Sequence, residues 1–323
     1  MTNVAKISYY FIGLTIFLIG YIGLGTPFIS ILFSFLILNF INRLFTSKAL
    51  TILIFTLLFI GILCGFGIFL KDAIRVLPHI ITTSVPSTVN ILKSYSLDRF
   101  LPFEDETGLK ELVSESIKGE LSFFANYAKI ATKEFVLIII GIVIACGLFI
   151  NSTLDLGKGD YKIKNNLYSL LCEQISLRFK NFYLSFYTVM GAQVIISLIN
   201  TTFTGLFVLL TGMSHAMVII VITFLCGLLP IIGNLISNSI IFLVGATESL
   251  NEAIAALVFL IILHKFEYFL NSKIIGGVIK NPMWLTLLSL VIGEKLAGIP
   301  GMILAPVILN YIKVESSQIE IQE

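Results

Sequence analysis

The sequence predicts an all-α polytopic membrane protein with about six transmembrane helices and two re-entrant helical hairpins. An amphipathic helical segment is expected between the third and fourth spans. Three observations predict this class. Of the 323 residues, 57% are hydrophobic and only 12% are charged, which is about half the charge of a soluble domain. Uncharged segments long enough to cross about 30 Å of hydrocarbon recur along the chain. Two further apolar segments are interrupted by proline and glycine near their middle.

The composition also excludes several classes of protein. A soluble globular enzyme would need more charge to cover its surface. The net charge of +2 includes no basic run, so no nucleic-acid partner is expected. The four cysteines and three histidines are scattered singly, which predicts no metal site and no cofactor. No nucleophile triad or phosphate-binding loop is present, so the sequence predicts neither an enzyme nor an ATP-driven pump.

The N-terminal region, 1–70, is expected to hold three transmembrane helices. Ile7–Asn42 contains no charged residue, and a glycine-rich stretch that ends at Pro27 divides it into two closely connected helices. Ala49–Leu70 is the third span. Each of these segments is close to the 20 apolar residues that a membrane crossing needs.

A polar region, 71–134, follows the third span. Within Leu109–Phe124, apolar residues recur at helical spacing with charged residues between them, the pattern of an amphipathic helix. A lid or an oligomer contact is one interpretation, but we favour a helix packed on its own protomer or on the bilayer surface. The next region, 135–182, is expected to contain the fourth span, Phe135–Leu154, and a basic cytoplasmic segment.

The region 183–313 is the predicted transport core, and it begins with a fifth span at Tyr183–Leu210. The apolar block 217–247 contains Pro230, which would break a continuous helix. Its two halves would be only about 18 and 21 Å long, too short to cross the membrane alone. This block is therefore predicted to be a re-entrant hairpin with its tip inside the membrane.

The break is repeated further along the chain. After a sixth span at Ala253–Leu270, the block 283–312 is divided by Ala297-Gly298-Ile299-Pro300-Gly301, and a polar tail, 314–323, ends the sequence. Paired interruptions of this kind indicate a transporter binding site. Hairpins at both places also put the lysines and arginines of the short loops on the cytoplasmic side, as the positive-inside rule requires.

Polar residues near the breaks are the candidate binding groups. Asn234 suits the N-cap of the second half-helix, and a polar stripe spaced four, three and four residues lies on one face of the preceding span. An alternative is that these side chains only hold neighbouring helices together. The candidate substrate-binding residues are Gln193, Ser197, Asn200, Thr204, Pro230, Gly233, Asn234, Ser237, Asn238, Gly298, Pro300 and Gly301.

Three ionisable residues are candidates for ion or proton coupling. Glu267 shares a helical face with His264, and Glu294 lies just before the second break. Ionisable groups at membrane depth are costly and mark ion or substrate paths. All three lie close to predicted segment ends, however, so an interfacial position is the alternative.

The stretch Leu228-Leu229-Pro230-Ile231-Ile232-Gly233 resembles the P-x-[IV]-G block of the autoinducer-2 exporter family of bacterial permeases. The C-terminal block around Gly298-Ile299-Pro300-Gly301 is similar to that family's C-terminal block. The resemblance implies six spanning helices with two re-entrant hairpins, a homopentamer and an elevator-like movement of the hairpin region. Members of the family include autoinducer-2 exporters and sodium(lithium)/proton antiporters.

These observations together predict a secondary transporter that exports a small polar solute, such as an autoinducer-2-like signalling molecule, without ATP. A sodium(lithium)/proton antiporter is the first alternative, and a non-transporting membrane scaffold is an alternative of another class. The expected partners are a small polar solute or a monovalent cation, membrane lipid and further copies of the chain. The expected location is the bacterial cytoplasmic (inner) membrane.

Overall fold

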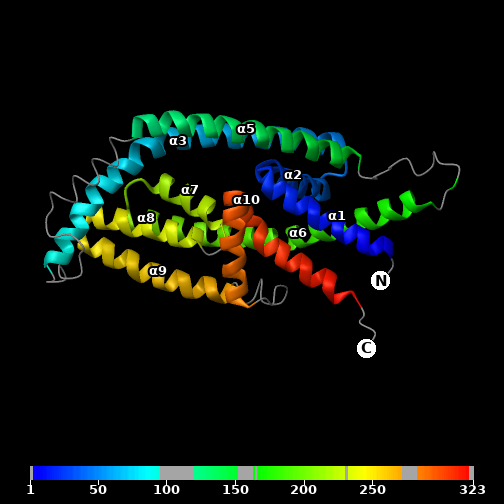
Figure 1. Cartoon of the computed structure of the whole chain (residues 1–323). Coiled ribbons are helices and arrows are strands. Elements are labelled where there is room, and N and C mark those ends of the chain that lie inside the picture. Colours follow the sequence, from blue (N-terminus) through cyan, green and yellow to red (C-terminus); the bar gives the residue numbers. More distant parts are fainter. Residues whose placement is uncertain are drawn as a thin grey trace. The chain divides into compact units, whose positions relative to one another are not determined.

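The computed structural model describes residues 3–94, 120–151, 163, 166–229, 232–270 and 282–319. Nearly all of the described residues are helical, as the composition predicts (Figure 1). The helices are α1 (Asn3–Tyr21), α2 (Gly25–Leu44), α3 (Lys48–Ser94), α5 (Glu120–Ile150), α6 (Leu167–Thr211), α7 (Ala216–Gly227), α8 (Ile232–Glu248), α9 (Leu250–Leu270) and α10 (Met283–Ser317).

Six of these helices are long and apolar enough to cross a membrane, which confirms the predicted class. The candidate spans are Val4–Tyr21, Gly25–Leu44, Lys48–Ala73, Thr132–Ile150, Leu167–Thr211 and Trp284–Ser317. The expected set differs in one member, because it counts the 21-residue helix α9 and treats the last segment as a hairpin.

Several helices continue beyond the apolar segments from which they were predicted. The third span is the first part of α3, which has 47 residues and runs on to Ser94. The fifth span is the second half of α6, a 45-residue helix about 68 Å long that begins at Leu167. The fourth span belongs to α5, which begins at Glu120; most of the predicted amphipathic helix, up to Gly119, lies outside the described residues.

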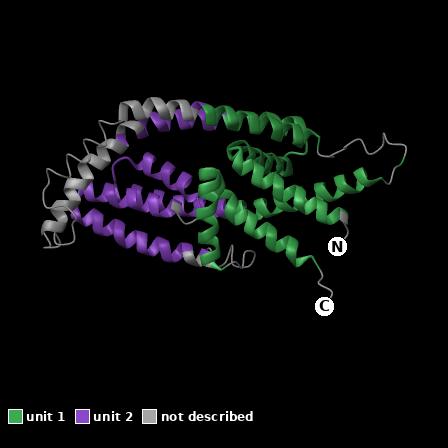
Figure 2. Cartoon of the chain, in the orientation of Figure 1, with its two compact units in different colours: residues 1–59, 133–192, 275–323 green, residues 60–132, 193–274 purple. Residues whose placement is uncertain are grey.

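The chain divides into two compact units, and α3, α5 and α6 each contribute to both (Figure 2). Unit 1 comprises residues 1–59, 133–192 and 275–323, and unit 2 comprises residues 60–132 and 193–274. We describe each unit by itself.

Unit 1 has two main apolar clusters. In the first, α6 contributes Phe182 and Phe186 to a core that also contains Ile12 of α1, Leu32 of α2 and Val307 of α10. In the second, residues of α2, α3 and α5 pack together. The members of this cluster are Leu38, Ile41, Phe55, Ala145 and Phe149.

Unit 2 is built on the C-terminal part of α6 and on α7, α8 and α9. Val208 of α6 packs with Ile219 of α7, Ile241 of α8 and Ala256 of α9 in one buried cluster. The cluster brings together three short helices that follow one another in sequence. It therefore fixes the first predicted break against the long helix α6.

Candidate functional site

The first break lies where the sequence predicts it. Helix α7 ends at Gly227 and α8 begins at Ile232, and Pro230 lies outside the described residues. The two helices run side by side in opposite directions (Figure 1), and Ile219 and Val244 belong to the same buried cluster. Because they are only 12 and 17 residues long, they have the helix–break–helix arrangement that a hairpin requires.

Gly233 allows the two helices to approach each other at this break. A Cβ atom at Gly233 would lie 1.6 Å from the carbonyl oxygen of Cys226 and 2.5 Å from its carbonyl carbon. No side chain fits between α8 and the last turn of α7. Glycine is required here by this close backbone approach, and the residue has the structural role of closing the hairpin.

The polar stripe of α6 faces this hairpin. Gln193 Nε2 donates a hydrogen bond to the carbonyl oxygen of Gly227 at 2.7 Å, and Ser197 Oγ donates to that of Phe224 at 2.8 Å. Both acceptors are carbonyls of the last turn of α7, which have no partner within their own helix. These two side chains therefore satisfy the backbone groups that the break exposes.

The remainder of the stripe is buried without partners. The side-chain oxygens Asn200 Oδ1 and Thr204 Oγ1 make no hydrogen bond in the described part of the chain, and both residues are at most 3% exposed. Thr223 of α7, which the sequence analysis did not single out, is also 3% exposed and has an unpartnered hydroxyl. Burying such groups without a partner costs free energy. These oxygens are the strongest indication of a binding position in unit 2.

Asn234 and Glu267, predicted as separate candidates, are brought together by the fold. Asn234 Nδ2 donates a hydrogen bond to Glu267 Oε1, and this contact joins the start of α8 to α9. The expected N-cap role of Asn234 is wrong, because α8 already begins at Ile232 and Asn234 lies in its first turn. The contact places a carboxylate directly beside the first break.

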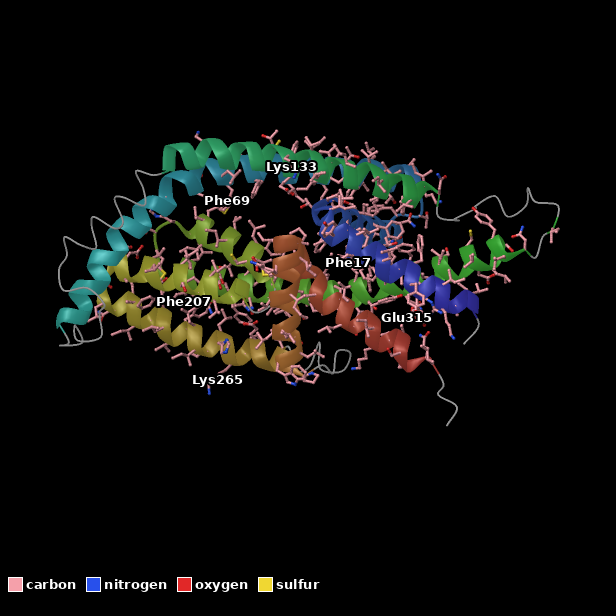
Figure 3. All side chains as sticks on the ribbon, in the orientation of Figure 1. Phe17, Phe69, Lys133, Phe207, Lys265 and Glu315 are labelled. Atoms are coloured by element: carbon pink, nitrogen blue, oxygen red, sulfur yellow. The ribbon has the colours of Figure 1, made fainter. Side chains whose placement is uncertain are left out.

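The other candidates of unit 2 lie around this contact. Ser237 is buried, and its hydroxyl donates to the carbonyl oxygen of Asn234 at 3.3 Å, while Asn238 is half-buried. His264 is exposed, as is the neighbouring Lys265, whose side chain extends away from α9 (Figure 3). His264 therefore does not join Asn234 and Glu267 in a buried cluster.

The second break lies in unit 1, within α10. Ala297 and Gly298 have non-helical backbone angles, and Gly298 has a φ of +61° that favours glycine. The helix turns back on itself there (Figure 1), so a Cβ atom at Gly301 would lie 1.8 Å from the carbonyl oxygen of Gly293. Pro300 is half-buried, and Glu294 is exposed. The predicted position of the break is confirmed.

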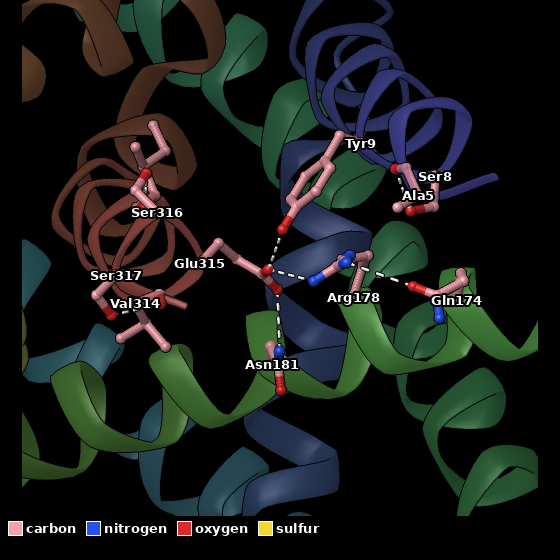
Figure 4. Close-up of polar contacts among 11 residues, drawn as sticks. Ala5, Ser8, Tyr9, Gln174, Arg178, Asn181, Val314, Glu315, Ser316 and Ser317 are labelled. Atoms are coloured by element: carbon pink, nitrogen blue, oxygen red, sulfur yellow. Dashed lines mark hydrogen bonds and ion pairs between the residues drawn. The ribbon is translucent and has the colours of Figure 1, made fainter. Parts of the chain in front are cut away.

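Unit 1 also contains a buried polar cluster that the sequence analysis missed (Figure 4). The carboxylate of Glu315 in α10 accepts hydrogen bonds from Tyr9 Oη at 2.8 Å and from Asn181 Nδ2 at 3.0 Å. It also forms an ion pair with Arg178 of α6. The Arg178 guanidinium carbon lies 4.1 Å from the centre of the Tyr9 ring, a cation–π contact. The cluster links α1, α6 and α10.

Sequence reasoning placed Arg178 in a basic cytoplasmic segment and Glu315 in a polar tail. One signal was available: Glu315 follows Tyr311 by four residues and Ile308 by seven, so it continues the buried face of α10. Among the residues that the structure describes, no three His, Cys, Asp or Glu side chains come together as metal ligands would.

The fold and this site define a multi-pass α-helical membrane protein with two broken apolar segments. The family model described as AI-2E family transporter matches residues 8–320, nearly the whole chain. The chain therefore belongs to the AI-2E transporter family, and it is a membrane transporter; a family of transporters is consistent with the expectation that the chain is not an enzyme. A search of curated proteins finds no match.

Proposed function

We propose that this chain is a secondary transporter that exports a small polar solute, such as an autoinducer-2-like signalling molecule, across the bacterial cytoplasmic membrane. The proposed site lies in unit 2, between the polar stripe of α6 and the first break. The second break belongs to unit 1, and a part for Gly298, Pro300 and Gly301 in the site stays a prediction.

The observation that carries the proposal is the set of unpartnered oxygens at Asn200, Thr204 and Thr223. In the apolar setting of a membrane helix, a buried hydroxyl or amide without a partner is costly unless a ligand or water meets it. These groups are neutral, and each can accept a hydrogen bond. They therefore suit a solute that carries hydroxyl groups.

Flux measured with the full chain in proteoliposomes, over a panel of small polar solutes and cations, tests this proposal. Thr204→Val is the informative variant because it removes only the unpartnered hydroxyl. We expect reduced flux with unchanged or slightly raised thermal stability, since no hydrogen bond within the protein is lost. Thr202→Val is the matched control: Thr202 is exposed on the same helix, and its hydroxyl donates to the carbonyl oxygen of Leu198 at 2.8 Å.

Flux that is unchanged in both Thr204→Val and Asn200→Leu would show that these side chains take no part in the site. Membership of a transporter family already argues against the remaining alternative, a non-transporting scaffold. Flux by this protein alone would eliminate that alternative.

Sodium(lithium)/proton antiport is a second candidate, and the contact between Asn234 and Glu267 favours it. A carboxylate at a helix break provides both an oxygen ligand for a cation and a group that can carry a proton. Glu267→Gln keeps the size and hydrogen-bonding capacity of the side chain but cannot titrate. Loss of proton-linked sodium or lithium flux in this variant supports antiport, and unaffected proton coupling contradicts it.

We extend the proposal to the membrane topology and assembly that the family resemblance implies. Both broken segments would be re-entrant, the chain would form a homopentamer, and transport would proceed by an elevator-like movement of the hairpin region. The shortness of α7 and α8 supports a re-entrant arrangement, because neither helix reaches the length of a span. Cysteine labelling at Asn251 from outside and at Asn281 from inside tests the topology, with Glu104 as the outside reference.

A further inference from the structure

Unit 1 contains an apolar cavity of about 490 Å³ between α1, the start of α2 and both halves of α10. Its lining side chains are apolar or glycine apart from Tyr9, Ser289 and Tyr311. The Tyr9 hydroxyl already donates to Glu315, and the Ser289 hydroxyl donates to the carbonyl oxygen of Thr286 at 2.7 Å. Water in this cavity would find few polar partners, so an apolar occupant suits it better.

Glycine in α1 makes the cavity wide. Gly13 lines it, and apart from its chain neighbours and the nearby backbone of α1 no protein atom lies within 4 Å of the position that a Cβ atom would occupy there. At Gly20, about two turns further on, the nearest such atom to the Cβ position is Leu296 Cβ at 4.0 Å. The volume is within the range of about 300–1,000 Å³ typical of ligand cavities. The lining helices α1 and α10 are candidate membrane spans, so the surrounding solvent is hydrocarbon.

Positive charge lies at one end of this cavity. Lys6 precedes the lining residue Tyr9 by three positions, and Lys313 follows the lining residue Leu309 by four, so each lysine shares a helical face with the lining. The hydrogen bond between Tyr9 and Glu315 shows that these parts of α1 and α10 lie at the same end of the unit (Figure 4).

The two lysines are available to a ligand. Both are exposed, and neither forms an ion pair within the described part of the chain. Helix α1 contains no acidic residue, and the stretch 299–317 of α10 contains only Glu315. The charge of Glu315 is already balanced by Arg178. Among the described residues of α1 and α10, this end of the cavity therefore carries two positive charges without an acidic partner beside an apolar interior, a pattern complementary to an anionic lipid.

We propose that this cavity binds an anionic phospholipid, with one acyl chain between α1 and α10 and the phosphate at Lys6 and Lys313. The apolar lining takes the place of neighbouring lipid tails around the chain. Lysines at a helix end extend toward the headgroup region, and each adds about 1 kcal/mol of attraction to an anionic surface, or about fivefold in affinity. The proposal does not depend on the transported solute.

Native mass spectrometry of the purified full chain tests the proposal, with phosphatidylglycerol and phosphatidylcholine added separately. We expect retained lipid with a preference for phosphatidylglycerol. Gly13→Leu should fill the cavity and abolish retention of both lipids. Gly147→Leu is the matched control, because Gly147 is also exposed on an apolar helix of unit 1, and no atom outside the adjoining part of that helix lies within 4 Å of its Cβ position.

The headgroup is tested separately. Lys6→Gln and Lys313→Gln should each lower the preference for phosphatidylglycerol about fivefold while lipid is still retained, and Lys133→Gln, at an exposed position of α5, should not. An unchanged preference in both lysine variants would overturn the anionic assignment.

Unchanged lipid retention in Gly13→Leu would overturn the cavity assignment. If this variant instead loses association between copies while lipid retention is unchanged, a second copy of the chain covers the cavity and the proposal is wrong. Should Gly13→Leu not assemble, Ile292→Phe narrows the same cavity from α10 and decides between these outcomes. The lipid proposal is tested by bound lipid and the transport proposal by flux, so failure of one is distinguishable from failure of the other.

Discussion

Substitution of Gly233 by alanine should open the first hairpin. The new Cβ atom would lie 1.6 Å from the carbonyl oxygen of Cys226, whereas an ordinary contact begins at 3.4 Å. The start of α8 and the end of α7 must therefore separate by about 1.8 Å or deform. Overpacking of this kind costs about 1–3 kcal/mol or more. The obstacle is backbone, so no side-chain rotation can relieve it.

The same separation should disturb the groups on both sides of the break. The hydrogen bond from Gln193 to Gly227 and the contact between Asn234 and Glu267 are both fixed by the hairpin. We therefore expect Gly233→Ala to lower both the thermal unfolding temperature in detergent and the flux in proteoliposomes.

Gly205→Ala is the matched control in this comparison. Gly205 is also a buried helical glycine of unit 2, but its Cβ position lies 3.6 Å from Ile220 Cδ1, an ordinary contact. Alanine there should be neutral or stabilising by up to about 1 kcal/mol, because alanine favours the helix. If Gly233→Ala matches Gly205→Ala in unfolding temperature and flux, the close approach does not exist in the protein and the hairpin geometry is wrong.

Three further predictions concern single polar contacts. Gln193→Leu should destabilise the protein by about 1–3 kcal/mol, measured by thermal unfolding, because it leaves the last carbonyl of α7 without a partner. Glu315→Ala should cost about 3–5 kcal/mol in the same measurement, because it leaves a buried arginine unpaired, whereas Glu294→Ala at an exposed position should change stability little. Asn234→Ala should lower flux about tenfold or more at equal membrane abundance. The variant loses a hydrogen bond to a carboxylate, and such a bond contributes about 1.5–3 kcal/mol. Wild-type flux would show that the tip is a structural kink.

The positions of both breaks were predictable from the sequence because proline and glycine act locally. Proline interrupts a continuous helix, so Pro230 marks the first break in the sequence. Gly233 allows the close approach of α8 to Cys226, and Gly298 adopts a backbone conformation that glycine favours. The burial of the stripe from Gln193 to Thr204 was predictable too, since four polar residues on one helical face do not suit contact with lipid.

The lengths of the long helices were not predictable by the same reasoning. Hydropathy marks only the part of a helix that crosses the membrane, and it does not mark where a helix ends in water. The polar first half of α6 leads into the apolar second half, and no glycine or proline before Gly191 marks a boundary between them. The partner of Glu315 was also beyond pattern reasoning, because Arg178 lies 137 positions away in the sequence. Such a pair depends on which helices pack together.

The sequence left two alternative roles open for the polar stripe of α6, as binding site and as packing contact; the structure shows packing contacts for two of its residues, and we propose the binding role for the other two. The end of a helix leaves carbonyl groups without partners in that helix, and Gln193 and Ser197 satisfy two of them at the end of α7. One helical turn further along the same face, Asn200 and Thr204 have no such partner. The side chains that hold the hairpin in place are therefore followed, on the same face of α6, by side-chain oxygens that have no hydrogen-bond partner in the described part of the protein. A solute that binds those oxygens would contact the same face of α6 that positions the hairpin, so solute binding and hairpin geometry would be coupled through one rigid helix.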